Sequence, residues 1–173
     1  QSYNRHIKKC EFIGKDGISL KEKWENGPKT VYGLAVPDFP NLLTLAGPQS
    51  GSVATNFPRG IEEAVDWSSD FLEFLEKNKI GHFNAKSEAE KFWNDHVTEM
   101  SEKILFAKEK SWFTGYNANV DKKYKGQCLI YAGGQIRFRE FITNEKIEEY
   151  PSFDKFTNDQ DFLEHLGEVT ATR

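Results

Sequence analysis

The chain has 173 residues and a formal net charge of −4, with acidic and basic side chains mixed along its length. This balance argues against nucleic acid or a membrane surface as the main partner, and no apolar run approaches the ~20 residues of a membrane-spanning helix. The length, together with 14 Phe, 6 Tyr and 4 Trp, is enough for one domain with a substantial core.

Cys10 and Cys128 are the two cysteines, and they form no C-x-x-C pair. We expect buried free thiols rather than a disulfide or a metal pair, which suits a reducing, cytoplasmic compartment. The sequence opens at Gln1 without a cap or a turn. We therefore also expect a fragment or a processed chain.

Short strands and turns are predicted for the first 46 residues. Phe12 and Ile13 are apolar and stand before a Lys-Asp-Gly turn, which predicts a strand at residues 11–13. Residues 20–24 predict a single helical turn before Gly27 and Pro28 break it. Residues 32–36 predict a second strand. Residues 41–46, apolar on both faces, predict a third strand buried inside a sheet.

Two amphipathic helices follow. From Ile61 the apolar residues recur on one side of a helix, with Pro58 in the first turn and Gly81 after the end. That apolar side consists of Ile61, Ala64, Val65, Phe71, Leu72 and Leu75. The second helix begins at Ser87, where a capping box with Glu90 is predicted. Its apolar stripe consists of Ala89, Trp93, Val97, Met100 and Ile104.

Mixed elements are predicted for the remaining third. Residues 111–126 form a loop rich in aromatics, and residues 127–132 a strand. Residues 135–149 are expected to be helical. A capping box at residues 157–160 starts a short helix that Gly167 ends. The order of strands and helices predicts an α/β protein with at least one strand–loop–helix unit.

Two loops could hold a ligand. Residues 47–60 connect the third predicted strand to a helix, and they are rich in small polar residues. Free backbone N–H groups and the helix dipole make such a place a seat for a flat or anionic ligand; the alternative is an ordinary connection. Trp112, in the second loop, either anchors that loop in the core or closes over a ligand.

The sequence offers no persuasive set of catalytic residues or metal ligands. The four histidines are far apart, and we interpret His96, beside an apolar stripe, as a histidine at the edge of the core. A nucleophile elbow, a P-loop and a Gly-x-Gly-x-x-Gly fingerprint are all absent from these 173 residues. Physical reasoning alone thus stops at an α/β domain with one candidate ligand seat.

An ordered series of short motifs runs from about residue 8 to residue 155. They are Asp16-Gly17 with residues 20–24, Gly27-Pro28, Tyr32-Gly33-Leu34, residues 39–42, Gly47-Pro48-Gln49-Ser50, Ile61-Glu62, Val65-Asp66-Trp67, Ala89-Glu90 with Trp93 and His96, residues 111–117, Tyr131 with Gly133-Gly134, and Tyr150 with Phe153. Each motif is weak alone, but together they resemble the C-terminal third of Baeyer–Villiger-type flavin monooxygenases, which use FAD and NADPH to insert oxygen next to a carbonyl.

The resemblance implies a fold, two cofactors and a site. Residues 1–155 would be the C-terminal part of a flavoprotein with two dinucleotide-binding domains, including the last strand–loop–helix of the FAD domain, and residues 156–173 a tail with a short helix. It also implies that the small residues after residue 46 are there because a flavin lies against that backbone. The implied cofactor-binding residues are Gly47, Pro48, Ser50, Asn56, Phe57 and Trp112, and the implied substrate-lining residues are Val53, Ala54 and Phe57.

The chain departs from the family in ways that affect activity. Both dinucleotide fingerprints of the family are missing here, and residues 116–125 replace its usual Pro-Gly turn. We therefore expect the chain to be inactive alone, with the missing N-terminal part of the same enzyme as its partner and a small ketone or heteroatom compound as substrate. The alternative is a truncated, non-catalytic fragment or an interaction module.

Overall fold

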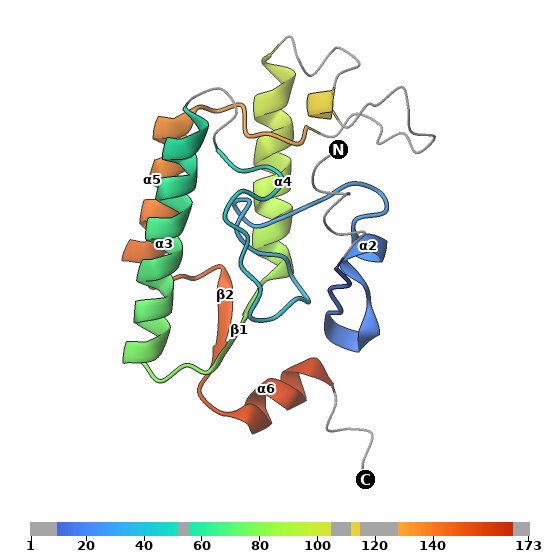
Figure 1. Ribbon diagram of the computed structural model, residues 1–173, viewed down its shortest axis with the longest axis vertical. Coiled ribbons are helices and arrows are strands. Elements are labelled where there is room, and N and C mark those ends of the chain that lie inside the picture. Colours follow the sequence, from blue (N-terminus) through green and yellow to red (C-terminus); the bar gives the residue numbers. More distant parts are fainter. Residues whose placement is uncertain (1–9, 52–55, 105–111, 115–127, 168–173) are drawn as a thin grey trace.

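The computed structural model describes residues 10–51, 56–104, 112–114 and 128–167, and at residue 112 it describes the backbone alone. Helices α3 (Phe57–Lys77) and α5 (Gln135–Ile147) lie side by side, and α4 (Ser87–Glu102) stands next to them (Figure 1). The connection between residues 24 and 51 fills the space in front of α4. The predicted mixture of helix and strand is confirmed.

Helix α3 follows from its sequence pattern. It starts four residues before the predicted Ile61, with Pro58 in its first turn, where a missing N–H costs nothing. The buried face consists of Gly60, Ala64, Trp67, Ser68, Phe71 and Leu75. Val65 and Leu72, which the pattern assigned to the buried side, are exposed because they lie one position beyond that stripe.

Helix α4 is present as predicted, but its capping box is not. Lys86 precedes the helix as the N-cap and makes no side-chain cap hydrogen bond, while Ser87 is already helical. Trp93, Val97 and Met100 form the buried stripe. The capping box instead occurs at the start of α2 (Leu20–Lys23), where Ser19 and Glu22 bond each other's backbone N–H groups.

The sheet is a two-stranded antiparallel ribbon that the sequence did not predict. Strand β1 (His82–Ala85) pairs with β2 (Phe153–Phe156), with His82 opposite Phe156 and Ala85 opposite Phe153. Each strand has four residues, too few for a clear period of two. The predicted division at residue 155 falls within β2 and stays a prediction.

The strands predicted for residues 11–13, 32–36 and 41–46 and the described part of 127–132 are not strands. Within them, single bridges join Ile13 to Ser19 and Val31 to Ala35. Positive φ values at Tyr32 and Asn41 turn the chain back on itself, which an extended strand cannot do. Residues 32–36 are buried as an irregular loop, residues 41–46 form a partly buried loop, and residues 11–13 are exposed.

Side-chain hydroxyls replace ladder partners in these loops. The Thr44 hydroxyl donates to the Gly33 carbonyl at 2.8 Å, and the Thr30 hydroxyl donates to the Pro48 carbonyl at 2.8 Å. Buried backbone groups need such partners wherever no ladder is formed.

Aromatic side chains dominate the main core. Phe71 of α3 lies 4.6 Å from the Tyr150 ring and 4.8 Å from the Phe153 ring, centroid to centroid. The Trp67 indole N–H donates to the Ile142 carbonyl of α5 at 2.9 Å. These contacts join α3 to α5 and to the β1–β2 ribbon. A second, smaller cluster contains Leu20, Trp24, Val36 and Phe39.

The remaining predictions divide between confirmed and wrong. Helix α6 (Asp159–Leu166) ends at Gly167 with φ of 79°, as expected. Its N-cap is Asn158, whose side chain accepts from the N–H of Asp161. Both cysteines are free, but Cys10 is exposed and only Cys128 is buried, which raises the pKa of its thiol. No helix among the described residues could cross a membrane.

Candidate functional site

Residues 47–51, the start of the predicted ligand seat, form a buried segment held by the protein itself. The N–H of Gly47 donates to the Gly33 carbonyl at 3.1 Å, and the N–H of Gln49 donates to the Leu129 carbonyl at 2.8 Å. The N–H of Ser50 donates to the Gly47 carbonyl at 3.3 Å. These three backbone donors are therefore not free to bind a ligand.

Gln49 is the centre of this segment and is almost fully buried. Its side-chain oxygen accepts from the N–H of Thr30 at 3.2 Å, and its amide nitrogen donates to Asn94 Oδ1 at 3.0 Å. Its carbonyl accepts from the Trp93 indole at 3.3 Å. One residue thus links the loop at residues 28–36 and helix α4 to the segment.

Packing against the protein accounts for two glycines of the segment. A Cβ at Gly47 would lie 2.3 Å from the Gly33 carbonyl oxygen, and one at Gly51 would lie 2.3 Å from the Phe138 ring. Such distances are far inside van der Waals contact, so no larger side chain fits. The implied explanation, a flavin against the backbone, is therefore not needed at these two positions.

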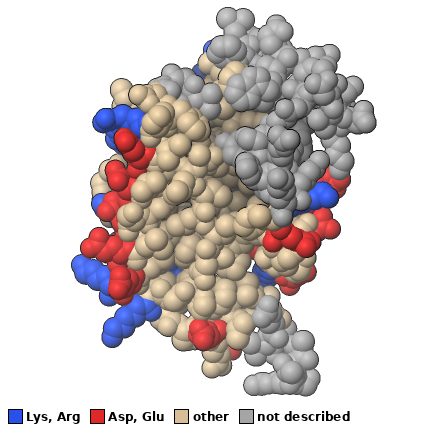
Figure 2. Space-filling model, in the orientation of Figure 1, with Lys and Arg blue, Asp and Glu red and all other residues tan. Residues whose placement is uncertain are grey.

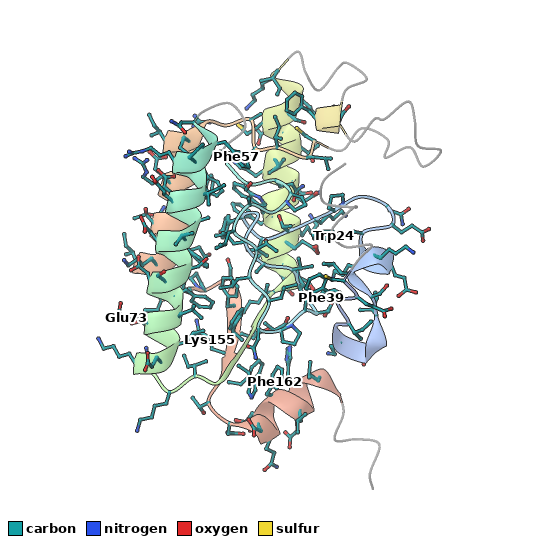
Figure 3. All side chains as sticks on the ribbon, in the orientation of Figure 1. Trp24, Phe39, Phe57, Glu73, Lys155 and Phe162 are labelled. Carbon is teal, nitrogen blue, oxygen red and sulfur yellow. The ribbon has the colours of Figure 1, made fainter. Side chains whose placement is uncertain are left out.

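The surface part of the seat begins where α3 begins. Asn56 precedes the helix and makes no side-chain cap hydrogen bond, although its carbonyl accepts from the N–H of Gly60. Phe57, 47% exposed, lies at the N-terminal end of α3 (Figure 3). The first turn of α3 contains no acidic residue. Val53 and Ala54 lie outside the described residues.

Trp112 is the first residue of a short 3₁₀ turn, Trp112–Thr114. Hydrogen bonds through Leu129 link the second residue of this turn, Phe113, to the predicted ligand seat. The Phe113 carbonyl accepts from the N–H of Leu129 at 2.8 Å, and the Leu129 carbonyl accepts from Gln49. The N–H of Tyr131 donates to the Ser50 carbonyl at 3.2 Å. Hydrogen bonds thus join the two predicted ligand loops through residues 128–131, a connection that sequence reasoning missed.

His96 is placed at the edge of the core, as predicted. Its Nε2 lies 3.1 Å from the Tyr131 hydroxyl, and its ring packs beside Trp93. Burial lowers the pKa of His96 and raises the pKa of Tyr131. Among the described residues, no group of three or more His, Cys, Asp or Glu side chains could hold a metal ion.

Charge is distributed unevenly over the face of the molecule seen in Figure 2. Figure 2 shows uncharged side chains across the centre of this face, with Lys, Arg, Asp and Glu along its α3 edge and, on the opposite side, around α2. Glu63 on α3 is bonded by Arg139 and Gln135 of α5, so this one charge near the start of α3 is paired across the two helices.

Comparisons with known proteins agree over most of the chain. A cyclohexanone 1,2-monooxygenase from Acinetobacter sp. is 34% identical over 146 residues, 84% of this chain and 26% of that enzyme. A Baeyer–Villiger monooxygenase from Pseudooceanicola batsensis is 31% identical over 144 residues, 83% of this chain and 26% of that enzyme. No family model matches the chain.

A solved structure gives the same result. The crystal structure of cyclohexanone monooxygenase from Rhodococcus sp. Phi1 bound to NADP⁺ superposes with a TM-score of 0.82 and 28% identity, over 90% of this chain and 28% of that one. The chain is a relative of the Baeyer–Villiger-type flavin monooxygenases. It matches the C-terminal portion of these flavin monooxygenases and spans about a quarter of the length of the curated relatives.

Proposed function

We propose that this chain forms part of an FAD- and NADPH-dependent monooxygenase that converts a ketone into an ester or lactone, or oxygenates a heteroatom. In the ketone reaction, one atom of O₂ enters beside the carbonyl, and the other leaves as water while NADPH becomes NADP⁺. The observation that carries the proposal is the agreement of sequence and fold with cyclohexanone monooxygenases over more than four fifths of the chain. Bound FAD, reduced by NADPH, would supply the electrons that activate O₂.

The burial of each residue separates two roles within the proposed site. We assign direct contact with FAD to Ser50, Asn56 and Phe57, because Ser50 is half-buried and the other two are exposed at the start of α3. Gly47 and Pro48 are buried, so their part is to shape the segment on which Ser50 stands. An exposed aromatic ring and a helix start without acidic residues suit a planar, electron-rich cofactor.

The remaining residues belong to the substrate and to NADPH. Val53 and Ala54 would line the substrate side of the flavin together with Phe57, and Trp112 would close over the nicotinamide. The hydrogen bonds through Leu129 support a shared site, because they join the turn that Trp112 starts to the segment before Ser50. No side chain of this chain is assigned a proton transfer.

The experiment compares two samples, namely the protein that carries this chain as an FAD-loaded holoenzyme and the 173-residue chain alone. Cyclohexanone, NADPH and O₂ are supplied, and lactone is measured by gas chromatography beside NADPH consumption at 340 nm. We expect lactone from the holoenzyme and neither lactone nor retained FAD from the chain alone. NADPH consumption without any oxygenated product, from cyclohexanone and from a thioether alike, would refute the proposal.

The alternative, a non-catalytic fragment or interaction module, is favoured by one observation. The dinucleotide fingerprint Gly-x-Gly-x-x-Gly, where FAD pyrophosphate binds at the first βα turn, is absent from these residues. Retention of FAD by the 173-residue chain after desalting would count against this alternative.

A further inference from the structure

Two histidines hold helix α6 against the β1–β2 ribbon. The ring of His82, in β1, stacks on Phe162 of α6 with centroids 4.1 Å apart and planes 6° apart. The ring of His165, in α6, packs on Phe156 of β2 with centroids 4.8 Å apart. Figure 3 shows Phe162 on the side of α6 that faces the ribbon. Both imidazoles are therefore part of the contact itself.

An asparagine amide faces each imidazole, and the backbone sets its orientation. Asn84 Oδ1 accepts from the N–H of Asp38 at 3.1 Å, so its NH₂ group must be the atom that lies 3.1 Å from His165 Nε2. Asn41 Oδ1 accepts from the N–H of Phe83 at 3.0 Å, so its NH₂ group faces His82 Nδ1 at 3.1 Å. An NH₂ group only donates, and both facing ring nitrogens must therefore lack a proton.

Protonation of either ring would therefore place two hydrogen-bond donors, the new ring N–H and the asparagine NH₂ group, against each other. Turning the amide of Asn84 or Asn41 does not help, because its NH₂ group would then face a backbone N–H. One hydrogen bond is lost in either orientation. Imidazole is the side chain that ordinarily gains this proton between pH 5 and 8.

The charged neighbours distinguish the two histidines. His82 Nε2 donates to the Asp159 carboxylate at 2.8 Å, and this partner would compensate a charge on the ring. His165 has no such partner among the charged groups recorded near it in the described structure. The Lys15 ammonium donates to the His165 carbonyl at 2.8 Å and places a positive charge at this helix end.

The other charged groups near this contact have hydrogen-bond or ion-pair partners of their own. Asp38 pairs with Lys23, and Asp154, opposite Asn84 across the ribbon, pairs with Lys86. On α6, Asp161 accepts from the side-chain amide of the N-cap Asn158 and Glu164 accepts from that of Gln160. The helix C-terminus favours a protonated histidine, but the Lys15 ammonium already binds its carbonyl there.

We propose that His165 is a pH-sensitive switch: its neutral ring keeps α6 docked on the β1–β2 ribbon, and its protonated ring releases the helix. His82 supports the docked helix at both pH values because Asp159 compensates its charge. Release would uncover the rings of Phe156 and Phe162, and the buried side chain of Leu166. This proposal is independent of any cofactor or reaction.

The test measures hydrogen–deuterium exchange of the α6 amides at pH 7.5 and pH 5.5 in the full chain, corrected for the intrinsic rate at each pH. We expect protection of α6 to fall about tenfold at pH 5.5, which corresponds to about 1.4 kcal/mol, the order of one lost buried hydrogen bond. Amides of α3 serve as an internal reference and should not change. Equal protection of α6 at the two pH values would overturn the proposal.

Three variants locate the effect. His165→Gln keeps an acceptor for the Asn84 amide but cannot gain a proton, so the pH dependence should vanish. His82→Gln is the matched control and should retain it. If His165→Gln is already released at pH 7.5, Asn84→Asp decides, because a carboxylate that faces a protonated His165 should keep α6 docked at pH 5.5. The proposal is contradicted if protection of α6 falls at pH 5.5 in His165→Gln or in Asn84→Asp as it does in the wild type. It is also contradicted if this fall is lost in His82→Gln.

Discussion

The hydroxyl of Tyr32 donates a hydrogen bond to Oε1 of Glu145 at 3.2 Å, across 113 residues of sequence. Glu145 is only 5% exposed. It also accepts from the Ser152 hydroxyl, and from the Ser152 N–H at 3.4 Å. This carboxylate therefore joins the loop at residues 28–36 to α5 and to the start of β2.

Removal of the Tyr32 hydroxyl should destabilise the fold without loss of packing. Tyr32→Phe keeps the ring but leaves the buried Glu145 one donor short, at a cost of about 1–3 kcal/mol in the free energy of unfolding. Urea unfolding followed by tryptophan fluorescence measures this. In the Glu145→Gln background the same change should cost less, because the acceptor is then uncharged, and equal costs in the two backgrounds would show that the charge of Glu145 does not strengthen this hydrogen bond.

Stability should fall in alkaline solution because buried tyrosines resist ionisation. Burial is the main cause that raises the pKa of Tyr150 to about 12, and it also raises the pKa of Tyr32. Above pH 10 the unfolded chain loses these protons while the folded chain keeps them, so stability is complete below about pH 10 and is lost as pH rises toward 12. Each such tyrosine contributes a slope of up to about 1.4 kcal/mol per pH unit.

Urea midpoints at pH 9, 10 and 11, with absorbance of tyrosinate at 295 nm, measure this slope. Tyr150→Phe removes one titrating group and should make the alkaline decline shallower. An unchanged slope in Tyr150→Phe would mean that this side chain ionises alike in the folded and unfolded states.

Gly47 should tolerate no side chain. Gly47→Ala places a Cβ against the backbone carbonyl of Gly33, which cannot rotate away, and we expect a loss of about 1–3 kcal/mol or more. The matched control is Gly81→Ala, since a Cβ there has no atom of the described structure within 4 Å. Thermal melts of both variants suffice, and a melting temperature for Gly47→Ala equal to that of the control would contradict the packing described for this segment.

The helices were predictable because their signals are local. The stripe from Ala64 to Leu75 has the helical period, and Pro58 and Gly167 mark boundaries through their own backbone preferences. The strands were not, because residues 32–36 are apolar for burial in an irregular loop and residues 41–46 form a partly buried loop. Positive φ at Tyr32 and side-chain hydrogen bonds there cannot be read from an apolar run.

The two loops of the candidate site were predictable from the sequence, but the fact that they lie together was not. The resemblance to a family directed attention to Ser50, Phe57 and Trp112, whereas their connection depends on hydrogen bonds of Leu129 and Tyr131, long-range pairings that leave no local pattern. The small residues of the seat do not all indicate a ligand, because at Gly47 the atoms that leave no room for a side chain belong to the protein itself.

Phe57 should matter for ligands more than for stability. Phe57→Ala removes a ring that is 47% exposed, and we expect the unfolding free energy to fall by less than about 1 kcal/mol. Phe71→Ala is the control, since that ring is fully buried and its truncation costs about 3–5 kcal/mol. In the holoenzyme, FAD affinity or the preference among ketones of different size should change in Phe57→Ala. A variant with normal stability, FAD content and ketone preference would remove Phe57 from the proposed site.

A variant of Trp112 can distinguish its two candidate roles, an anchor in the core and a residue that closes over NADPH. In the holoenzyme we predict that Trp112→Ala weakens NADPH binding roughly three- to tenfold and lowers the yield of oxygenated product, with FAD content near normal. Stacking of an indole on a planar ring contributes about 0.5–1.5 kcal/mol beyond the area it buries, and about 1.4 kcal/mol is a factor of ten in affinity.

The matched control is Trp67→Ala, because Trp67 is a core tryptophan whose indole bonds the Ile142 carbonyl. Its truncation should cost about 3–5 kcal/mol of stability. A melting curve and an NADPH titration on the same preparation separate the two roles. If Trp112→Ala melts as early as Trp67→Ala, while each folded molecule binds NADPH as the wild type does, Trp112 is an anchor. A melting temperature within a few degrees of the wild type, with weaker NADPH binding, assigns it to the cofactor, since the turn that Trp112 starts is joined through Leu129 to residues 47–51, the segment proposed to lie beside FAD.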